Sequence, residues 1–167
     1  LLPGEISPGL RTLVYQGQRY FVTGEGYDGI GEINADEGGT PADLDRLLRP
    51  ATLANDSRIC NCELIGDPTE GALLAMAAKA GWDVENLAPH SPRIAEIPFD
   101  SAYKFQAAFH IEGDRCRLYV KGAPDALLAR AAWHLTAEGE AALDPAALSY
   151  WNAENGKLAG KAMRVLA

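Results

Sequence analysis

The sequence has no long apolar segment and no excess of basic residues. Its longest uninterrupted apolar run, Ala72 to Ala78, is far short of the roughly 20 residues that a bilayer-spanning helix needs. With 15 Lys plus Arg against 23 Asp plus Glu, the formal net charge is −8, which argues against binding to nucleic acids or anionic membrane surfaces. We therefore expect no nucleic-acid partner and no direct membrane contact, and a local basic cluster must hold any anionic ligand.

Cysteine is scarce, and its spacing excludes the common cysteine-based sites. Cys60, Cys62 and Cys116 are an odd number, and the first two have neither C-x-x-C spacing nor nearby histidines. We expect no metal site and interpret the three as buried thiols in a reducing compartment. No signal peptide is predicted, because the first residues do not combine a charged region with an apolar one.

The composition that remains is that of a soluble globular protein, with 47% hydrophobic and 23% charged residues. No repeat or low-complexity tract interrupts it. A chain of 167 residues has the length of one ordinary domain and can bury a core. The sequence therefore predicts a single domain over residues 1–167.

Two glycine patterns resemble nucleotide-binding motifs but lack the context that those motifs require. Gly24 to Gly29 matches G-x-G-x-x-G, yet more glycines and no helical periodicity follow it, whereas a dinucleotide site needs a helix that starts inside the motif. Gly66 to Gly71 has the frame of a P-loop, but Ala72 and Leu73 replace the required lysine and Ser/Thr. We expect neither to bind phosphate.

Helix starts are predicted where proline follows a capping residue or a strand end. In the second helix Asp67 is the cap, Glu70 occupies the capping-box position and Gly81 ends the helix. Pro50 either interrupts the first helix or begins the next, and the third helix is expected to bury Leu127, Leu128 and Ala131. The four predicted starts are Thr40-Pro41, Asp67-Pro68, Pro124 and Asp144-Pro145.

Strands are predicted as two hairpins. Residues 10–15 and 19–23 flank a short Gly-containing loop, and residues 104–111 and 116–121 flank a turn near Gly113. Antiparallel pairing of the second hairpin places Lys104 opposite Lys121 to within a residue or two. Opposed like charges cost up to roughly 1 kcal/mol. An anionic ligand between the two lysines is the economical explanation.

The stretch Lys121 to Asp125 is the junction between that strand and the third helix. It places a cation beside Gly122, where no Cβ obstructs an approaching group. Upstream, Phe99 is an aromatic ring that suits a stacked base with phosphates near the two lysines. Residues 163–167 are expected to begin a strand, with Arg164 as the third basic candidate.

Four motifs in this order and spacing resemble the nucleotide-binding domain of P-type ATPases. The first two are similar to the calcium-pump branch, and the resemblance extends from about Val22 to the last residue. It implies an α+β fold with an antiparallel twisted β-sheet flanked by helices. The motifs are GDPTEGALL at 66–74, FDSAYK at 99–104, KGAPD at 121–125 and MRVLA at 163–167.

The resemblance also implies roles for individual residues in binding ATP. Phe99 is expected to stack on adenine and Glu70 to face its edge, while Lys104 and Lys121 border the base and reach toward the phosphates. Gly122 is expected to let the backbone approach the ring, and Arg164 to contact the phosphate end. Supporting motif positions are Asp67, Thr69, Asp100, Ser101, Ala123, Pro124 and Asp125.

The sequence departs from the family pattern in two ways. Asp125 stands where glutamate is usual, and uncharged Ala102 and Tyr103 replace charged residues. Gln106 lies near the position of a methionine. These differences bear on the affinity for the nucleotide. The phosphorylated motif Asp-Lys-Thr-Gly is absent, so we expect no catalytic residue here.

The resemblance implies a cytoplasmic fragment of an integral membrane pump that binds ATP without turning it over. Its partners are then the phosphorylation and actuator domains of the same chain, and Mg²⁺ arrives with the nucleotide and is bound mainly by the phosphorylation domain.

Two other functions remain as alternatives. A dinucleotide-binding oxidoreductase domain would use Gly24 to Gly29, although the helix that it needs is not predicted. A non-catalytic interaction module would use the acidic loop around Asp36-Glu37 to recruit a partner or calcium.

Overall fold

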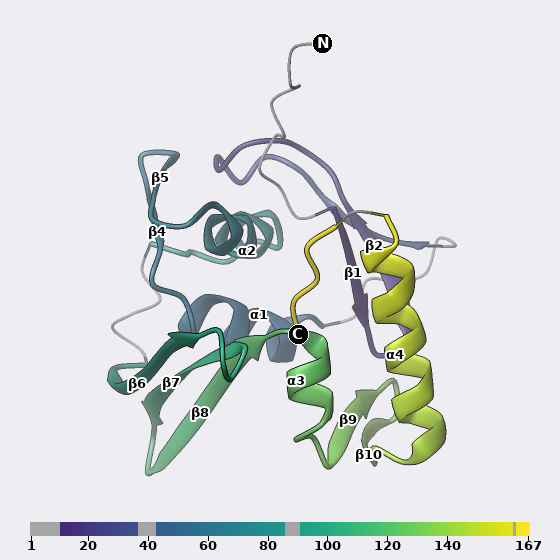
Figure 1. Ribbon diagram of the computed structural model, residues 1–167. Helices are drawn as coiled ribbons and strands as arrows, with labels where there is room; N and C mark the ends of the chain where they lie inside the picture. The colour runs from purple at the N-terminus through teal and green to yellow at the C-terminus, as the bar shows by residue number, and fades with distance from the viewer. Residues whose placement is uncertain (1–10, 37–42, 86–90, 162) are drawn as a thin grey trace. The chain divides into compact units, whose positions relative to one another are not determined.

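The computed structural model describes residues 11–36, 43–85, 91–161 and 163–167 (Figure 1). They form two compact units that divide between Pro92 and Arg93, and each unit is described by itself. Every strand pair is antiparallel, and helices accompany the sheets in both units. The predicted α+β class with antiparallel sheets flanked by helices is confirmed. Among the described residues, no helix combines the length and apolarity needed to cross a bilayer.

The first unit begins with the predicted hairpin. Strands β1 (Thr12–Tyr15) and β2 (Gln18–Val22) pair antiparallel, and β3 (Ile33–Ala35) adds to β2 in the order β1-β2-β3. Gln16 and Gly17 form the turn with φ of 53° and 78°, the left-handed pair that favours a tight two-residue hairpin. Tyr20, in the middle strand, is fully buried.

The glycine-rich segment after β2 is a loop from β2 to β3, as the missing helical period predicts. Its ends are joined by hydrogen bonds between Thr23 and Glu32, in which Thr23 N donates to the Glu32 carbonyl and Glu32 N to Thr23 Oγ1. Gly24 has a φ of 78°, and a Cβ there would lie 2.0 Å from the Ile30 carbonyl oxygen. The glycine is therefore required by the closure of the loop itself.

Helix α1 (Asp45–Leu53) runs through Pro50 as one helix, so the prediction that Pro50 ends or begins a helix is wrong. The ring removes one backbone donor, but Ala54 N still donates to the Pro50 carbonyl and continues the helical pattern. The predicted start at Thr40-Pro41 lies outside the described residues. Helix α1 packs against α2 (Pro68–Lys79).

Helix α2 has the start and end that its sequence predicts. The Asp67 carboxylate accepts hydrogen bonds from the backbone N–H groups of Thr69 and Glu70, and Pro68 occupies the first helical position. At the other end Gly81 has a φ of 86°, and Trp82 N donates to the Ala77 carbonyl. This pairing is a Schellman ending, which needs the left-handed glycine.

A hairpin of β4 (Arg58–Cys60) and β5 (Glu63–Ile65) lies between the two helices and was not predicted. Its turn, Asn61-Cys62, has φ of 51° and 64° without any glycine, so the usual turn signal is absent from the sequence. Cys60, Cys62 and Cys116 are all free and exposed. The interpretation of the three as buried thiols is wrong, because Cys60 and Cys62 are exposed at the tip of the β4-β5 hairpin and Cys116 is exposed near the start of β8.

The second unit contains the larger sheet, ordered β6-β7-β8. Strands β6 (Arg93–Asp100), β7 (Phe105–Glu112) and β8 (Arg115–Gly122) pair antiparallel in sequence, with a turn at Gly113 as predicted. On the open edge of β8, Ala167 N donates to the Gly122 carbonyl and Gly122 N donates to the Ala167 carbonyl. The expected strand at 163–167 is thus reduced to one antiparallel bridge within the described residues.

Helix α3 (Pro124–Leu128) follows β8 and α4 (Pro145–Ala159) follows a second hairpin, both at the predicted starts. Helix α3 is shorter than predicted, so Ala126 is the buried residue, Leu127 and Leu128 are half-buried and Ala131 is exposed. The hairpin of β9 (Trp133–Thr136) and β10 (Gly139–Ala142) was not predicted. Trp151 on α4 joins it through a hydrogen bond from Nε1 to His134 Nδ1 of 3.2 Å.

Candidate functional site

Phe99, Gln106 and Lys121 lie at one level of the β6-β7-β8 sheet. Lys121 on β8 is directly opposite Gln106 on β7, so their side chains share a face. On β6 the register shifts between Ile97, which pairs with Ala107, and Asp100, which pairs with Phe105, so Pro98 and Phe99 together lie opposite Gln106. Phe99 is 62% exposed while Lys121 is only 7% exposed. An accessible aromatic ring therefore lies beside sheltered polar groups.

The turn from β6 to β7 holds Lys104 in a defined position. Asp100 accepts hydrogen bonds through its carbonyl from Lys104 N at 2.7 Å and through its carboxylate from Ala102 N at 2.7 Å. Lys104 has a φ of 62°, an unusual conformation for a residue with a Cβ. Its carbonyl accepts the hydrogen bond of Ala123 N, which fixes the turn to the end of β8.

Lys104 lies two residues from the position opposite Lys121, within the predicted offset. The partner of Lys104 is Asp125, whose Oδ2 is 2.9 Å from Nζ, with both side chains more than half exposed. The predicted repulsion between the lysines is therefore relieved by Asp125 without a ligand. The hydrogen bond from Lys104 also lowers the pKa of the Asp125 carboxyl below its usual value, because it favours the charged form.

Gly122 lies at a crowded point of the second unit. A Cβ at this position would be 2.3 Å from the Lys104 carbonyl oxygen and 2.6 Å from the Phe105 Cβ. The glycine is thus required by the close approach of β7 and the turn before it. Sequence reasoning assigned it to ligand approach alone, because the crowding depends on a strand register that no local pattern reveals.

Arg164 is exposed and belongs to the last described segment, which Ala167 fastens to Gly122. This bridge places the segment along the same end of β8 as Lys121 and the start of α3. Phe99, Lys104, Lys121, Gly122 and Arg164 therefore all belong to the second unit.

Glu70 belongs to the first unit, on the first turn of α2. Its Oε2 accepts hydrogen bonds from Asp56 N at 3.0 Å, Ser57 N at 3.0 Å and Ser57 Oγ at 2.9 Å. The predicted capping box is wrong in detail, because Asp67 N donates to Ser57 Oγ at 2.8 Å and the hydroxyl stands between Asp67 and Glu70. Glu70 thus fixes the loop before β4.

The supporting residues mostly shape backbone. Asp67 caps α2, and Thr69 N donates one of the hydrogen bonds that the Asp67 carboxylate accepts. In the second unit Ser101 lies in the turn that Asp100 organises. Ala123 is the N-cap of α3 and Pro124 is its first residue. Their shared role is to hold the ends of the sheet and the helices in place.

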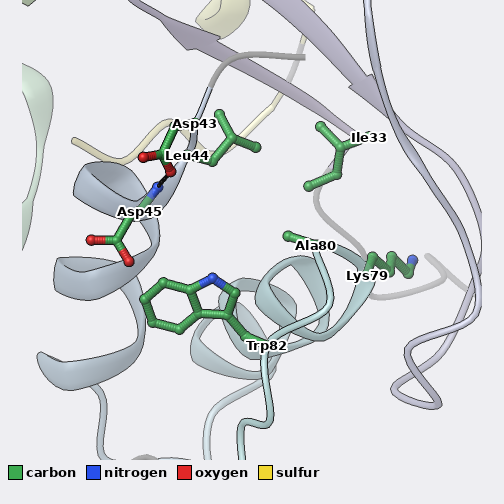
Figure 2. Close-up of a pocket in the computed structure, with 7 residues that line it drawn as sticks. All are labelled: Ile33, Asp43, Leu44, Asp45, Lys79, Ala80 and Trp82. Atoms are coloured by element: carbon green, nitrogen blue, oxygen red, sulfur yellow. Dashed lines mark hydrogen bonds between the residues drawn. The ribbon is translucent and has the colours of Figure 1, made fainter.

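The first unit also contains a cavity of about 320 Å³ where the end of α2 meets β3 and the start of α1 (Figure 2). Trp82, Asp45 and Lys79 line it, and Lys79 Nζ donates to the Gly24 carbonyl at 2.9 Å. None of the residues predicted to bind nucleotide lines this cavity. Residues 37–42, which include Glu37 of the acidic loop, lie outside the described part of the chain.

Charge is divided unequally between the units. Residues 1–92 contain six Lys or Arg and 14 Asp or Glu, whereas residues 93–167 contain nine of each. The whole net charge of −8 therefore belongs to the first unit, and the neutral second unit is the better host for an anion. No group of three or more His, Cys, Asp or Glu in the described ranges could hold a metal ion.

Gln106 is the site candidate that sequence reasoning did not select. It was noted only as the replacement for a methionine, although the alternation of β7 already placed it on the face away from Phe105. The register adds the decisive fact that it lies between Phe99 and Lys121.

Comparison with known proteins places these observations in a family. Residues 43–167 match the family model described as P-type ATPase, cytoplasmic domain N. The chain is 39% identical over 137 residues to the cation-transporting ATPase pma1 of Synechocystis, with 74% of this chain and 15% of the relative aligned. It is 38% identical over 130 residues to calcium-transporting ATPase 1 of Lactococcus lactis, covering 77% and 15%.

A mammalian relative agrees. The calcium-transporting ATPase type 2C member 1 of Bos taurus is 40% identical over 95 residues, which are 54% of this chain and 10% of that protein. The chain thus spans about 15% or less of these relatives. The match extends across 43–167 and includes all four sequence motifs, and the chain belongs to the P-type ATPase family as its cytoplasmic domain N.

Proposed function

We propose that this domain binds ATP on the β6-β7-β8 sheet and presents the γ-phosphate to an aspartate on a separate phosphorylation domain. The observation that carries the proposal is the row of Phe99, Gln106 and Lys121 across three neighbouring strands. It offers a planar ring for stacking, an amide for the base edge and a cation at one level of the sheet. Each of these chemistries matches a part of ATP.

Each group has a distinct task in this proposal. The adenine stacks on the exposed face of Phe99, since aromatic rings bind bases without needing a particular hydrogen-bond pattern. Lys121 borders the base. Lys104 and Arg164 contact the phosphates, the lysine through a compact ammonium charge and the arginine through its planar guanidinium donors.

In the whole protein the reaction is phosphoryl transfer, which depends on positioning and on neutralising phosphate charge. This domain supplies the positioning, and the phosphorylated aspartate belongs to another part of the chain. Mg²⁺ bound with the nucleotide would neutralise phosphate charge, and no group of three or more His, Cys, Asp or Glu among the described residues could hold it. The domain is then a cytoplasmic part of a membrane-bound cation pump, working with its phosphorylation and actuator domains, and alone it binds ATP without turnover.

An amide-shift titration tests the proposal. ATP added to the isotopically labelled chain is expected to move the amide signals of Phe99, Gln106 and Lys121 together, with one affinity. Trp133 on β9 is the internal control, because its ring is 63% exposed, nearly the same as Phe99, but lies on a different hairpin. Unmoved signals of the three residues at millimolar ATP would exclude the site.

The dinucleotide alternative receives no support from the fold. The Gly24 to Gly29 segment is a strand-to-strand loop, and no helix starts within it. The same titration with NADH is expected to leave the loop signals unchanged.

A further inference from the structure

The tip of the β4-β5 hairpin carries two exposed thiols that the proposed function does not use. Cys60 is the last residue of β4 and pairs with Glu63, and Cys62 is the second residue of the two-residue turn. Both are free and exposed. Cysteine is among the most frequently buried residue types, so two exposed thiols within three residues are unusual.

The turn itself does not explain the choice of cysteine. Residue 62 has a φ of 64°, and turns of this type favour glycine at that position because other residues are strained there. Asn61 at a φ of 51° satisfies the first turn position well. The local backbone therefore favours Asn-Gly, and the cysteine side chain at residue 62 is not accounted for by folding.

The spacing lets both sulfur atoms reach a single small ion. Residues i and i+2 have Cα atoms at most about 7 Å apart, since each residue advances the chain by about 3.3–3.6 Å. Two metal–sulfur bonds of about 2.3 Å span the gap between the thiols with freely chosen side-chain rotamers. A disulfide would instead demand one particular dihedral angle about the S–S bond.

We propose that Cys60 and Cys62 form a two-thiolate site for a soft, thiol-seeking metal ion of the Cu(I) type. The ligand number favours this class, because no third His, Cys, Asp or Glu completes a metal-binding group in the part of the chain that the structure describes. Zn²⁺ requires four ligands, whereas Cu(I) is satisfied by two soft sulfurs. On binding, each thiol releases its proton to solvent, two Cu–S bonds form and the oxidation state of copper stays the same.

Copper transfer from a chelator tests the site without involving nucleotide. The reduced chain is mixed under anaerobic conditions with Cu(I) supplied as its bicinchoninate complex, and loss of the complex's colour reports transfer. The expected result is one Cu(I) per wild-type chain and none for C60S. X-ray absorption at the copper edge is expected to show two sulfur ligands and no nitrogen.

Two variants separate a specific site from incidental thiol chemistry. C116S is the matched control, because Cys116 is also free and exposed but stands alone on β8, and it is expected to keep full binding. C62G creates the favoured Asn-Gly turn, so it is expected to fold at least as well as wild type while losing the copper. Failure of the wild-type chain to take copper, or equal loss in C116S and C60S, overturns the site.

Discussion

Lys104 and Asp125 form an ion pair, with Nζ 2.9 Å from Oδ2, at the point where the β6-β7 turn meets the first turn of α3. Asp125 is therefore paired with Lys104, the same cation that is proposed to bind phosphate. The two acceptors compete for one ammonium group, and the pair is exposed enough to be exchanged at little cost. Under the proposed function, we expect this competition to let Asp125 tune nucleotide affinity without contacting the adenine.

Replacing Asp125 by asparagine is expected to tighten ATP binding. The change frees Lys104 and removes a negative charge near the phosphates, and because exposed pairs are weak the gain is at most about fivefold. Calorimetric titration measures it. D114N is the control, since Asp114 is an exposed acid at the far turn of β7-β8. Weaker binding in D125N would show that the aspartate supports the site instead of competing with the phosphates.

The acid titration of Asp125 follows from the same pair. Lys104 lowers the pKa of this carboxyl below its usual 3.8. The Asp125 carboxylate therefore stays charged as the pH falls through the ordinary carboxyl range, and the ion pair is lost only as the pH falls through the lowered pKa. Carboxyl ¹³C shifts followed against pH are expected to give a midpoint below 3.8 in the wild type. In K104Q the midpoint should rise toward the usual value, while K104R should keep it low.

Phe99→Ala is expected to weaken ATP binding by about 1–3 kcal/mol, the usual contribution of stacking between a base and an aromatic ring. The side chain is 62% exposed, so its removal leaves the fold intact. W133A removes an equally exposed ring from another hairpin and should leave the affinity unchanged. Equal affinity of F99A and wild type, with both folded, would remove the ring from the site.

The elements that the sequence predicted are those with a local cause. Asp67 caps α2 and Gly81 ends it because their side chain and backbone act within one turn. The β7-β8 hairpin was visible because alternation and Gly113 are both short-range signals. Such features survive in the structure whatever surrounds them.

The features that were missed depend on distant partners or on turns with unusual residues. The β4-β5 turn has Cys62 where glycine is favoured, so Asn61 alone signals the turn in the sequence. Pro50 remains inside α1, where packing against α2 outweighs the loss of a donor. Glu70 turns to Ser57, 13 residues away, instead of its own N-cap. Candidate nucleotide residues could be selected by motif, but their pairing required the strand register.

Glu70→Ala is expected to destabilise the chain by about 1–3 kcal/mol, because three donors of residues 56 and 57 lose their shared acceptor. Urea denaturation measures the change, and E63A, which removes an exposed carboxylate from β5, is the control with no expected effect. E70Q keeps an acceptor oxygen and is expected to recover most of the stability.

Two glycine substitutions of the same kind are expected to act in opposite directions. Gly122→Ala introduces a Cβ 2.3 Å from the Lys104 carbonyl oxygen, and strain of this kind costs about 1–3 kcal/mol. Gly156→Ala lies in α4, where a Cβ meets no atom within 4 Å, so the lower backbone entropy of alanine should add about 0.5–1 kcal/mol. Urea denaturation of both variants, each compared with wild type, measures the two signs.

The stability and the ATP affinity of G122A, each compared with wild type, also show why residue 122 is glycine. If strand crowding is the cause, G122A loses stability. Any loss of ATP affinity is then an indirect result of a shift in the β6-β7 turn. If the backbone must instead approach the adenine, G122A should keep the stability of the wild type and lose binding. The 2.3 Å approach to the carbonyl oxygen favours the first outcome, because backbone on both sides of the contact has little freedom to move.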